Sequence, residues 1–196
     1  MLFRRQGKGT FVAPAKIGHD ISTKLSFSAA MQNLDLRHET TVLDAGLWPA
    51  PRNIGPTLGE TEGSSVVFLR RLRSVEGEPA AVHLAYVPAR FAEILDGDLT
   101  ASLTDLMAGV GARVARSQDT AEAVPAADED ARLLDVSPGA PLIRIEGVAF
   151  SADQQPLRYT EALYRGDRFR FSVDTTNSDN PGLEIKGGDF DASREP

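Results

Sequence analysis

The segment from Val66 to Val87 constrains the fold more than any other part of the sequence. Two runs rich in Val, Leu, Phe and Ala, residues 66–75 and 80–87, flank a four-residue turn with the sequence Glu-Gly-Glu-Pro. Two extended runs joined by so short a connection form an antiparallel hairpin, because a parallel pair needs a crossover of a dozen or more residues. The chain is therefore expected to contain an antiparallel sheet that includes this hairpin.

Further strands and short helices accompany the hairpin along the chain. Hydrophobic patterning predicts further strands at residues 41–48, 112–124, 141–151 and 157–173. It predicts short helices at residues 27–36, from Pro88, at 102–107 and from Asp128 until Ser137-Pro138-Gly139 ends the last one. Hairpins separated by single helices indicate an α+β domain with a mostly antiparallel sheet rather than alternating βαβ units.

Composition narrows the class of protein. The 196 residues, 41% of them hydrophobic, suffice for one domain with appendages. No apolar run approaches the roughly 18 residues that span a bilayer, and the first residues do not lead into a signal peptide. There are no cysteines and only three scattered histidines, so we expect no metal, no cofactor, no membrane association and a cytoplasmic location. The net charge of -7 argues against autonomous DNA binding.

Strand alternation places Arg71 and Arg73 on one face of their strand, beside Val67 and Leu69. Two adjacent guanidinium groups on a half-buried sheet repel each other unless anions lie between them, and arginine binds carboxylate or phosphate in a forked geometry. The alternative is a pair of structural salt bridges to acidic residues on neighbouring strands.

Three further residues have both a ligand-binding and a structural interpretation. Glu161 would accept hydrogen bonds from a ligand or would neutralise the arginine pair. His83 lies between Ala81 and Ala85, small residues that leave space above the sheet, but a lone histidine is more often a packed, hydrogen-bonded group. Ser102 begins a helix, where it would cap the helix or help to bind an anion. No catalytic set is evident, and residues 7–10 resemble a phosphate loop only superficially.

The amino terminus resembles the end of the winged helix-turn-helix domain of GntR-type regulators. Residues 6–12, Gln-Gly-Lys-Gly-Thr-Phe-Val, look like the tip of the wing, which in that family lies beside the DNA minor groove. The resemblance makes Arg5, Gly7, Lys8 and Gly9 the remnant of a DNA contact. The recognition helix that precedes such a wing is absent from these residues, so we expect operator DNA to be bound only by a full-length form.

The remainder resembles the ligand-binding UTRA domain of the HutC subfamily. The ordered stretches that carry the resemblance are residues 71–73, 77–79, 86–88, 102–106, 131–134, 138–142, 159–161 and 164–169. The resemblance implies a chorismate-lyase-like α+β fold, a homodimer, and effector-controlled release of a repressor from DNA, without enzymatic activity. It also implies a small-molecule effector, carrying carboxylate or phosphate, that is bound by Phe27, Ser28, Arg71, Arg73, Ser102, Thr104 and Glu161.

Two positions depart from the family pattern, so no specific sugar effector carries over. His83 stands where many members have Glu, and Thr104 stands where an aromatic residue is frequent. The expected division is a wing remnant at 1–13, a linker at 14–26, the effector domain at 27–173 and a flexible tail at 174–196. Two alternatives remain open at this stage: a chorismate-lyase-like enzyme acting on a small carboxylate, and a dimerisation subunit that antagonises full-length relatives.

Overall fold

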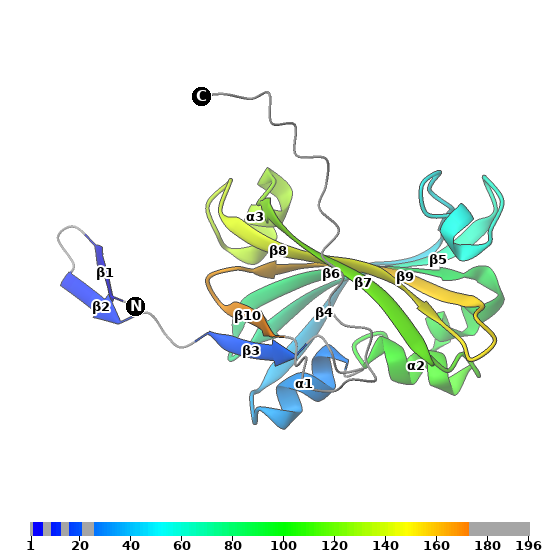
Figure 1. The fold of residues 1–196 in the computed structure, drawn as a ribbon, viewed down its shortest axis with the longest axis horizontal. Helices are drawn as coiled ribbons and strands as arrows, with labels where there is room; N and C mark the ends of the chain where they lie inside the picture. Colours follow the sequence, from blue (N-terminus) through cyan, green and yellow to red (C-terminus); the bar gives the residue numbers. More distant parts are fainter. Residues whose placement is uncertain (1, 6–8, 13–15, 21–25, 173–196) are drawn as a thin grey trace, which may run out of the picture.

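A computed structural model describes residues 2–5, 9–12, 16–20 and 26–172 of the chain (Figure 1). Of the amino-terminal residues 2–5, 9–12, 19 and 20 it describes only the backbone. The predicted tail at 174–196 and the predicted wing-tip residues Gly7 and Lys8 lie outside the described residues.

Six antiparallel strands form the central sheet. Their order across the sheet is β4-β5-β6-β9-β8-β7. Their bounds are β4 (His38–Pro49), β5 (Ser65–Val75), β6 (Glu78–Pro88), β7 (Arg116–Pro125), β8 (Pro141–Phe150) and β9 (Pro156–Arg165). The predicted hairpin is β5–β6, and at its turn Glu76 and Gly77 both have positive φ, 52° and 78°. Two such residues form the tight turn whose twist matches that of the strands.

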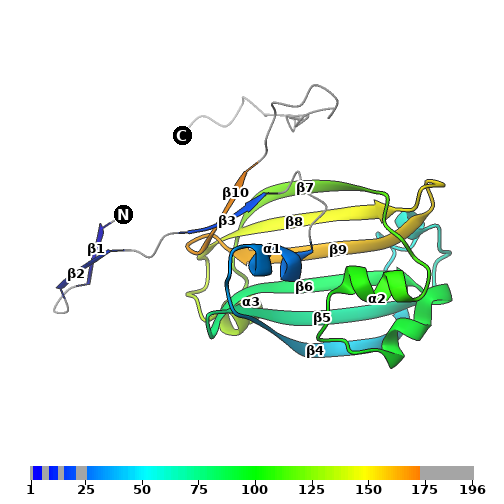
Figure 2. The same ribbon diagram turned by 90° about the horizontal axis from the view of Figure 1, so that it is seen from below.

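Short helices pack on both faces of this sheet. The helices are α1 (Phe27–Asn33), η1 (Pro56–Leu58), η2 (Ala89–Asp96), α2 (Leu103–Gly109) and α3 (Asp128–Leu134). Figures 1 and 2 show α1 and α2 side by side on one face, where η2 also packs; we call this the helix-covered face. On the opposite face, the α3 face, α3 and the segment around η1 cover the two ends of the sheet.

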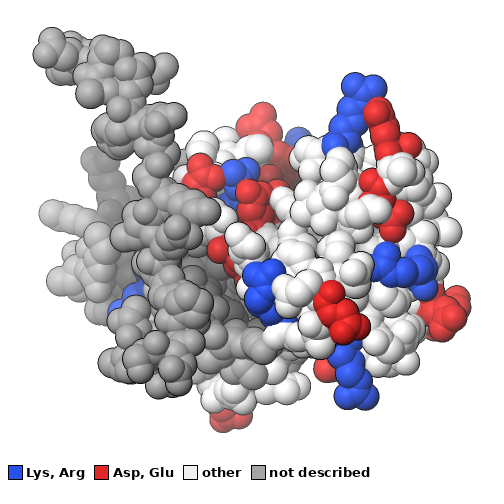
Figure 3. Space-filling model, turned by 45° about the vertical axis from the view of Figure 1, so that its right-hand side comes forward, with Lys and Arg blue, Asp and Glu red and all other residues white. Residues whose placement is uncertain are grey.

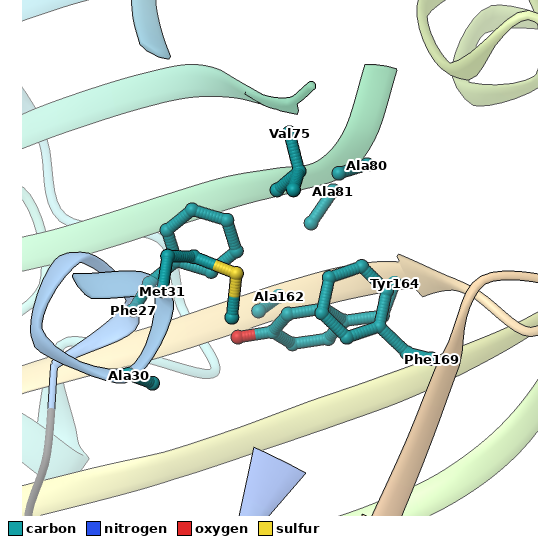
Figure 4. Packing of buried hydrophobic residues seen from close by; sticks show 9 residues of the cluster. All are labelled: Phe27, Ala30, Met31, Val75, Ala80, Ala81, Ala162, Tyr164 and Phe169. Carbon is teal, nitrogen blue, oxygen red and sulfur yellow. The ribbon is translucent and has the colours of Figure 1, made fainter. Parts of the chain in front are cut away.

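Two apolar clusters attach α1 and α2 to the sheet. Beneath α1, Phe27 and Met31 point toward Ala162 and Tyr164 of β9 (Figure 4). Beneath α2, Leu103 and Met107 pack with alternate residues of β5 and β6, among them Val67, Leu69, Ala85 and Val87. The period-two alternation that predicted the strands therefore also determines which residues lie under the helices.

The end of the chain differs from the prediction of a single strand over residues 157–173. β9 ends at Arg165, and β10 (Phe169–Ser172) then pairs in parallel with β3 (Ile17–Asp20). The break falls at Gly166, whose amide donates to the Pro141 carbonyl at 3.1 Å. A Cβ at residue 166 would lie 2.7 Å from that carbonyl oxygen, so the turn approaches β8 more closely than a side chain permits.

The described parts of the amino-terminal segment contain three short strands, where the sequence predicted a wing followed by a linker. β1 (Leu2–Arg5) and β2 (Gly9–Val12) form an antiparallel hairpin with Arg5 opposite Gly9, consistent with the shape expected of a wing. The predicted linker at 14–26 is not wholly irregular, because it contains β3. The sequence of β3 has no clear alternation, so only its partner β10 could have revealed it.

Candidate functional site

β5 places Arg71 and Arg73 side by side beneath the helices of the helix-covered face, where both are almost fully buried, with 3% and 2% of their surface exposed. Arg71 donates to the carbonyl oxygens of Ala101, at 2.8 Å, and Leu99, at 3.4 Å, in the loop before α2. Arg73 donates to the hydroxyl of Thr40 on β4. Both side chains are thus held in position by neutral oxygen atoms.

Neither arginine has an acidic partner within the described part of the chain. The nine ion pairs found there involve other arginines. Burial, followed by the charges of Arg73 and Arg158, lowers the pKa of Arg71 to about 9, and burial lowers that of Arg73 to about 10. Both stay charged at neutral pH, so the site holds buried positive charge that an anion would compensate. Among the described residues, neither arginine forms the structural salt bridge that was the alternative.

Two serines begin the helices beside this charge, and they behave differently. The Ser26 hydroxyl caps α1 by accepting from the Ala29 amide at 3.2 Å. Ser102 occupies the same position before α2 but makes no capping bond, and its buried hydroxyl has no hydrogen-bond partner among the described residues. The predicted capping role of Ser102 is therefore absent, and its hydroxyl is available to another group.

A cavity of about 650 Å³ opens between α1, the start of β4 and the loop before α2. Its lining includes Thr40 and Ala101, the residues to which Arg73 and Arg71 donate, so both arginines lie directly behind its wall. The other lining residues are Ser26, Ser28, Ala29, Gln32, His38, Glu39, Thr100, Ser102 and Asp105. Two arginines thus lie behind the wall of the cavity, and Glu39 and Asp105 are the acidic residues that line it.

Phe27 and His83 lie close to the arginine pair. His83 on β6 is directly opposite Arg71 on β5. The Phe27 ring stands edge-on to His83 at 5.4 Å, and the Arg73 guanidinium lies 5.5 Å from its centroid. Phe27 therefore joins α1 to both residues, and a displacement of α1 would change the surroundings of the charged pair.

Glu161 is not part of this site, and the prediction that placed it with the arginines is wrong. In the pairing of β6 with β9, His83 lies opposite Ala162 and Leu84 opposite Glu161. Ala162 therefore shares the helix-covered face with Arg71, and Glu161 points to the α3 face. There it lies opposite Glu146 of β8, and burial raises the pKa of the Glu161 carboxyl. Alternation along one strand divides its residues between two faces, but it does not determine which face continues a given face of the neighbouring strand.

Arg158 is a residue on this face that sequence reasoning missed. It precedes Tyr159 on β9, so it belongs to the alternation set opposite to that of Glu161. Its guanidinium donates to the hydroxyl of Thr104 at 3.2 Å. Thr104 is thus placed on α2 near the site, as predicted, but through a contact with an arginine. The available signal was the register of β9, which the sequence did not determine.

The described residues contain no candidate for a metal site or a membrane span. No group of three or more metal-binding side chains is found there. None of the described helices is long and apolar enough to cross a bilayer. On the side drawn in Figure 3, acidic and basic side chains of the described residues are interspersed rather than gathered by sign. The charge that distinguishes this molecule is therefore the buried charge beneath α1 and α2.

Buried cations beside a cavity on an α+β sheet define a domain that binds a ligand. The UTRA domain family matches residues 33–170, well over half of the chain, so the chain belongs to the UTRA domain family of GntR/HutC transcriptional regulators. It is 24% identical over 173 residues to the HTH-type transcriptional repressor NagR of Bacillus subtilis, covering 87% of this chain and 71% of NagR.

Solved structures show the same fold. The crystal structure of PhnF from Mycobacterium smegmatis superposes with a TM-score of 0.78 at 24% identity, covering 88% of this chain and 77% of PhnF. The separate effector domain of that protein gives a TM-score of 0.74 at 23% identity, covering 78% of this chain and 95% of that domain. The family match, rather than these structures, identifies the effector-binding domain of a transcriptional regulator in this chain, and the curated relatives it matches are regulators rather than enzymes.

Proposed function

We propose that this domain senses a small anionic metabolite through Arg71, Arg73 and Ser102. The observation that carries the proposal is a set of buried polar groups at the cavity wall: within the described part of the chain, two guanidinium groups have no carboxylate partner and the Ser102 hydroxyl has no hydrogen-bond partner. A phosphate or carboxylate would compensate the charge and accept hydrogen bonds from all three residues. Ser28 lines the same cavity and would add a fourth donor.

The acidic side chains that line the cavity limit which groups the rest of the ligand would carry. Glu39 and Asp105 line the same cavity as Ser102. A carboxylate repels a second anion but accepts hydrogen bonds from hydroxyl or amino groups. The proposed effector therefore has its anionic group toward Arg71 and Arg73 and its hydroxyl or amino groups toward Glu39 and Asp105.

Binding would control DNA through a shift between two conformations of a homodimer. A ligand shifts such an equilibrium only by its difference in affinity for the two states. Phe27 connects α1 to the charged pair, so α1 is the element whose position a bound anion would bias. In a full-length cytoplasmic regulator the shift would move the DNA-binding domains relative to their half-sites. The homology to a protein named as a repressor supports release from DNA as the outcome.

The homodimer would use the uncovered middle of the α3 face. Aromatic rings cross four strands there, from Trp48 to Phe68 at 5.3 Å, to Tyr86 at 5.2 Å and to Tyr159 at 6.3 Å. Trp48 is 47% exposed, although large apolar side chains favour burial. Trp48→Ser is expected to shift the sedimentation equilibrium of a dimer toward monomer. A monomeric wild-type chain at micromolar concentration would contradict this part of the proposal.

Ligand screening by thermal shift tests the sensing function. Sugar phosphates, amino acids, carboxylates and phosphonates are the probes, with mass spectrometry of co-purifying metabolites to identify the natural ligand. Arg71→Ala and Arg73→Ala should each weaken binding of a confirmed ligand by roughly 10- to 100-fold. Arg70→Ala, on the other face of the same strand, is the matched control and should leave affinity unchanged. If both buried variants bind as the wild type does, the proposed pocket is wrong.

A further inference from the structure

Arg158 is a third cation on the helix-covered face, and it is partly buried. Its Nη1 donates to the Thr104 hydroxyl at 3.2 Å and lies 3.8 Å from the Met107 sulfur, beneath the first turns of α2. Its Nε is buried and has no hydrogen-bond partner among the described residues. Burial lowers the pKa of Arg158, because a charged guanidinium is less well solvated in these surroundings than in water.

No carboxylate pairs with Arg158 in the described part of the chain. The acidic group that influences it most is Asp119 of β7, which raises its pKa by less than burial lowers it. Asp119 accepts a hydrogen bond from Ser117 at 2.7 Å and forms no ion pair there. Arg158 is therefore a cation whose hydrogen-bond partner is a neutral hydroxyl, as is the case for Arg73, whereas Arg71 donates to backbone carbonyls.

Arg71 and Arg158 approach α2 from different strands. Arg71, on β5, bonds to Ala101 just before the helix, whereas Arg158, on β9, bonds to Thr104 within it. The charge of Arg158 contributes to lowering the pKa of Arg71, so the two cations influence each other. One anion held between Arg71 and Arg73 would leave Arg158 uncompensated.

The sheet between His83 and Arg158 carries small side chains. Ala85, Thr160 and Gly147 lie side by side on β6, β9 and β8 in the row between these two residues. This row belongs to the helix-covered face, because Ala85 packs in the cluster beneath α2. Asp119 covers the Gly147 end of this row, because a Cβ at residue 147 would collide with the Asp119 Oδ1. A ligand that extends from Arg71 toward Arg158 would therefore cross the small side chains of Ala85 and Thr160.

We infer that the effector carries two anionic groups, one held by Arg71 and Arg73 and the second by Arg158. This inference rests on the proposed function and specifies the class of ligand: a phosphate or phosphonate joined to a carboxylate by a short polar chain, or a dicarboxylate of similar length. Arg158 thereby becomes a residue that determines specificity, selecting two-anion ligands over ligands with one anion.

The test compares matched pairs of probes by isothermal titration. One series consists of ω-carboxyalkylphosphonates with one to four methylene groups, and each is paired with the alkylphosphonate of the same length. The wild-type chain is expected to bind at least one carboxylated member 10-fold or more tightly than its uncharged counterpart. Arg158→Gln is expected to remove this preference while changing the affinity for the alkylphosphonate less than 2-fold. Arg71→Gln is expected to weaken both.

The two ways to fail are distinguishable. If no pair shows a preference in the wild type, or if Arg158→Gln keeps it, the second anionic subsite does not exist, whereas the proposed function stands as long as Arg71→Gln weakens binding. If Arg71→Gln changes nothing, the proposed function itself fails.

A structural role of Arg158, holding α2 through Thr104, would give a different result. Thr104→Val removes the anchoring hydroxyl with little change in volume, so loosening α2 by this route should affect both probes of a pair equally and preserve the preference. Melting curves of all three variants serve as the control for folding. A preference that Thr104→Val abolishes as completely as Arg158→Gln would overturn the inference.

Discussion

The arginines on the two faces of β5 differ in whether an acidic side chain neutralises them. On the α3 face, Arg70 is 2.5 Å from Glu129 and 3.5 Å from Asp130, both in the first turn of α3. On the helix-covered face, its neighbour Arg71 and then Arg73 are more deeply buried and have only neutral partners in the described chain. On the α3 face, the acidic first turn of α3 neutralises the arginine from within the chain. On the helix-covered face, the arginine charges are left for a ligand to neutralise. We therefore regard Arg70 as a structural charge and Arg71 and Arg73 as functional ones.

The same substitution at these adjacent arginines should change stability in opposite directions, and this is the largest effect expected. Arg71→Met or Arg73→Met replaces a buried, uncompensated cation with an apolar side chain of similar length. The free energy of unfolding of the ligand-free domain should rise by about 1–4 kcal/mol. Arg70→Met removes a partly exposed ion pair and should lower Tm by roughly 2 °C. Chemical denaturation without ligand measures all three, and a loss of stability in every variant would contradict the contrast.

The two helix-capping serines offer a comparison of intermediate size. Ser26→Ala should cost about 1 kcal/mol, because the Ser26 hydroxyl accepts from the Ala29 amide. Ser102→Ala should leave stability unchanged, because its hydroxyl has no partner in the described residues. Ser102→Ala should instead weaken binding of a confirmed anionic ligand by roughly 5- to 10-fold. Equal losses of stability in both variants would show that Ser102 has a structural role.

The smallest effect concerns Glu161 and its dependence on pH. Burial, with a smaller contribution from Glu146, raises the pKa of Glu161 in the folded domain. The folded state then holds its proton more tightly than the unfolded state, so stability falls as pH rises from the unfolded pKa through the folded one. Glu161→Gln should therefore gain a few tenths of a kcal/mol at pH 7 and nothing at pH 4. A gain that is independent of pH, measured by thermal melting, would argue against this origin.

The sequence predicted those features that local patterns control. Alternation in residues 66–75 assigned Arg71 and Arg73 to one face, and the following turn made the hairpin antiparallel, as the structure has it. The same reasoning failed at Glu161 and missed Arg158, which are only three residues apart on β9. Either set of alternating residues on β9 could have faced the arginines, and only the register of β9 with β6 determines which set does. Likewise, β3 and β10 pair with each other although almost the whole domain separates them in the sequence, so local patterns could not predict either strand.

The pairing of β3 with β10 has a consequence for the order of folding. Phe169, on β10, is 1% exposed and packs against Tyr164, with ring centroids 5.1 Å apart, in the cluster that also contains Phe27 of α1. The core beneath α1 is therefore incomplete until the ribosome has released the last strand of the domain. Closing so long a loop is entropically costly and happens late. During synthesis, residues 17–20 consequently have no strand partner until the final residues of the domain have been made.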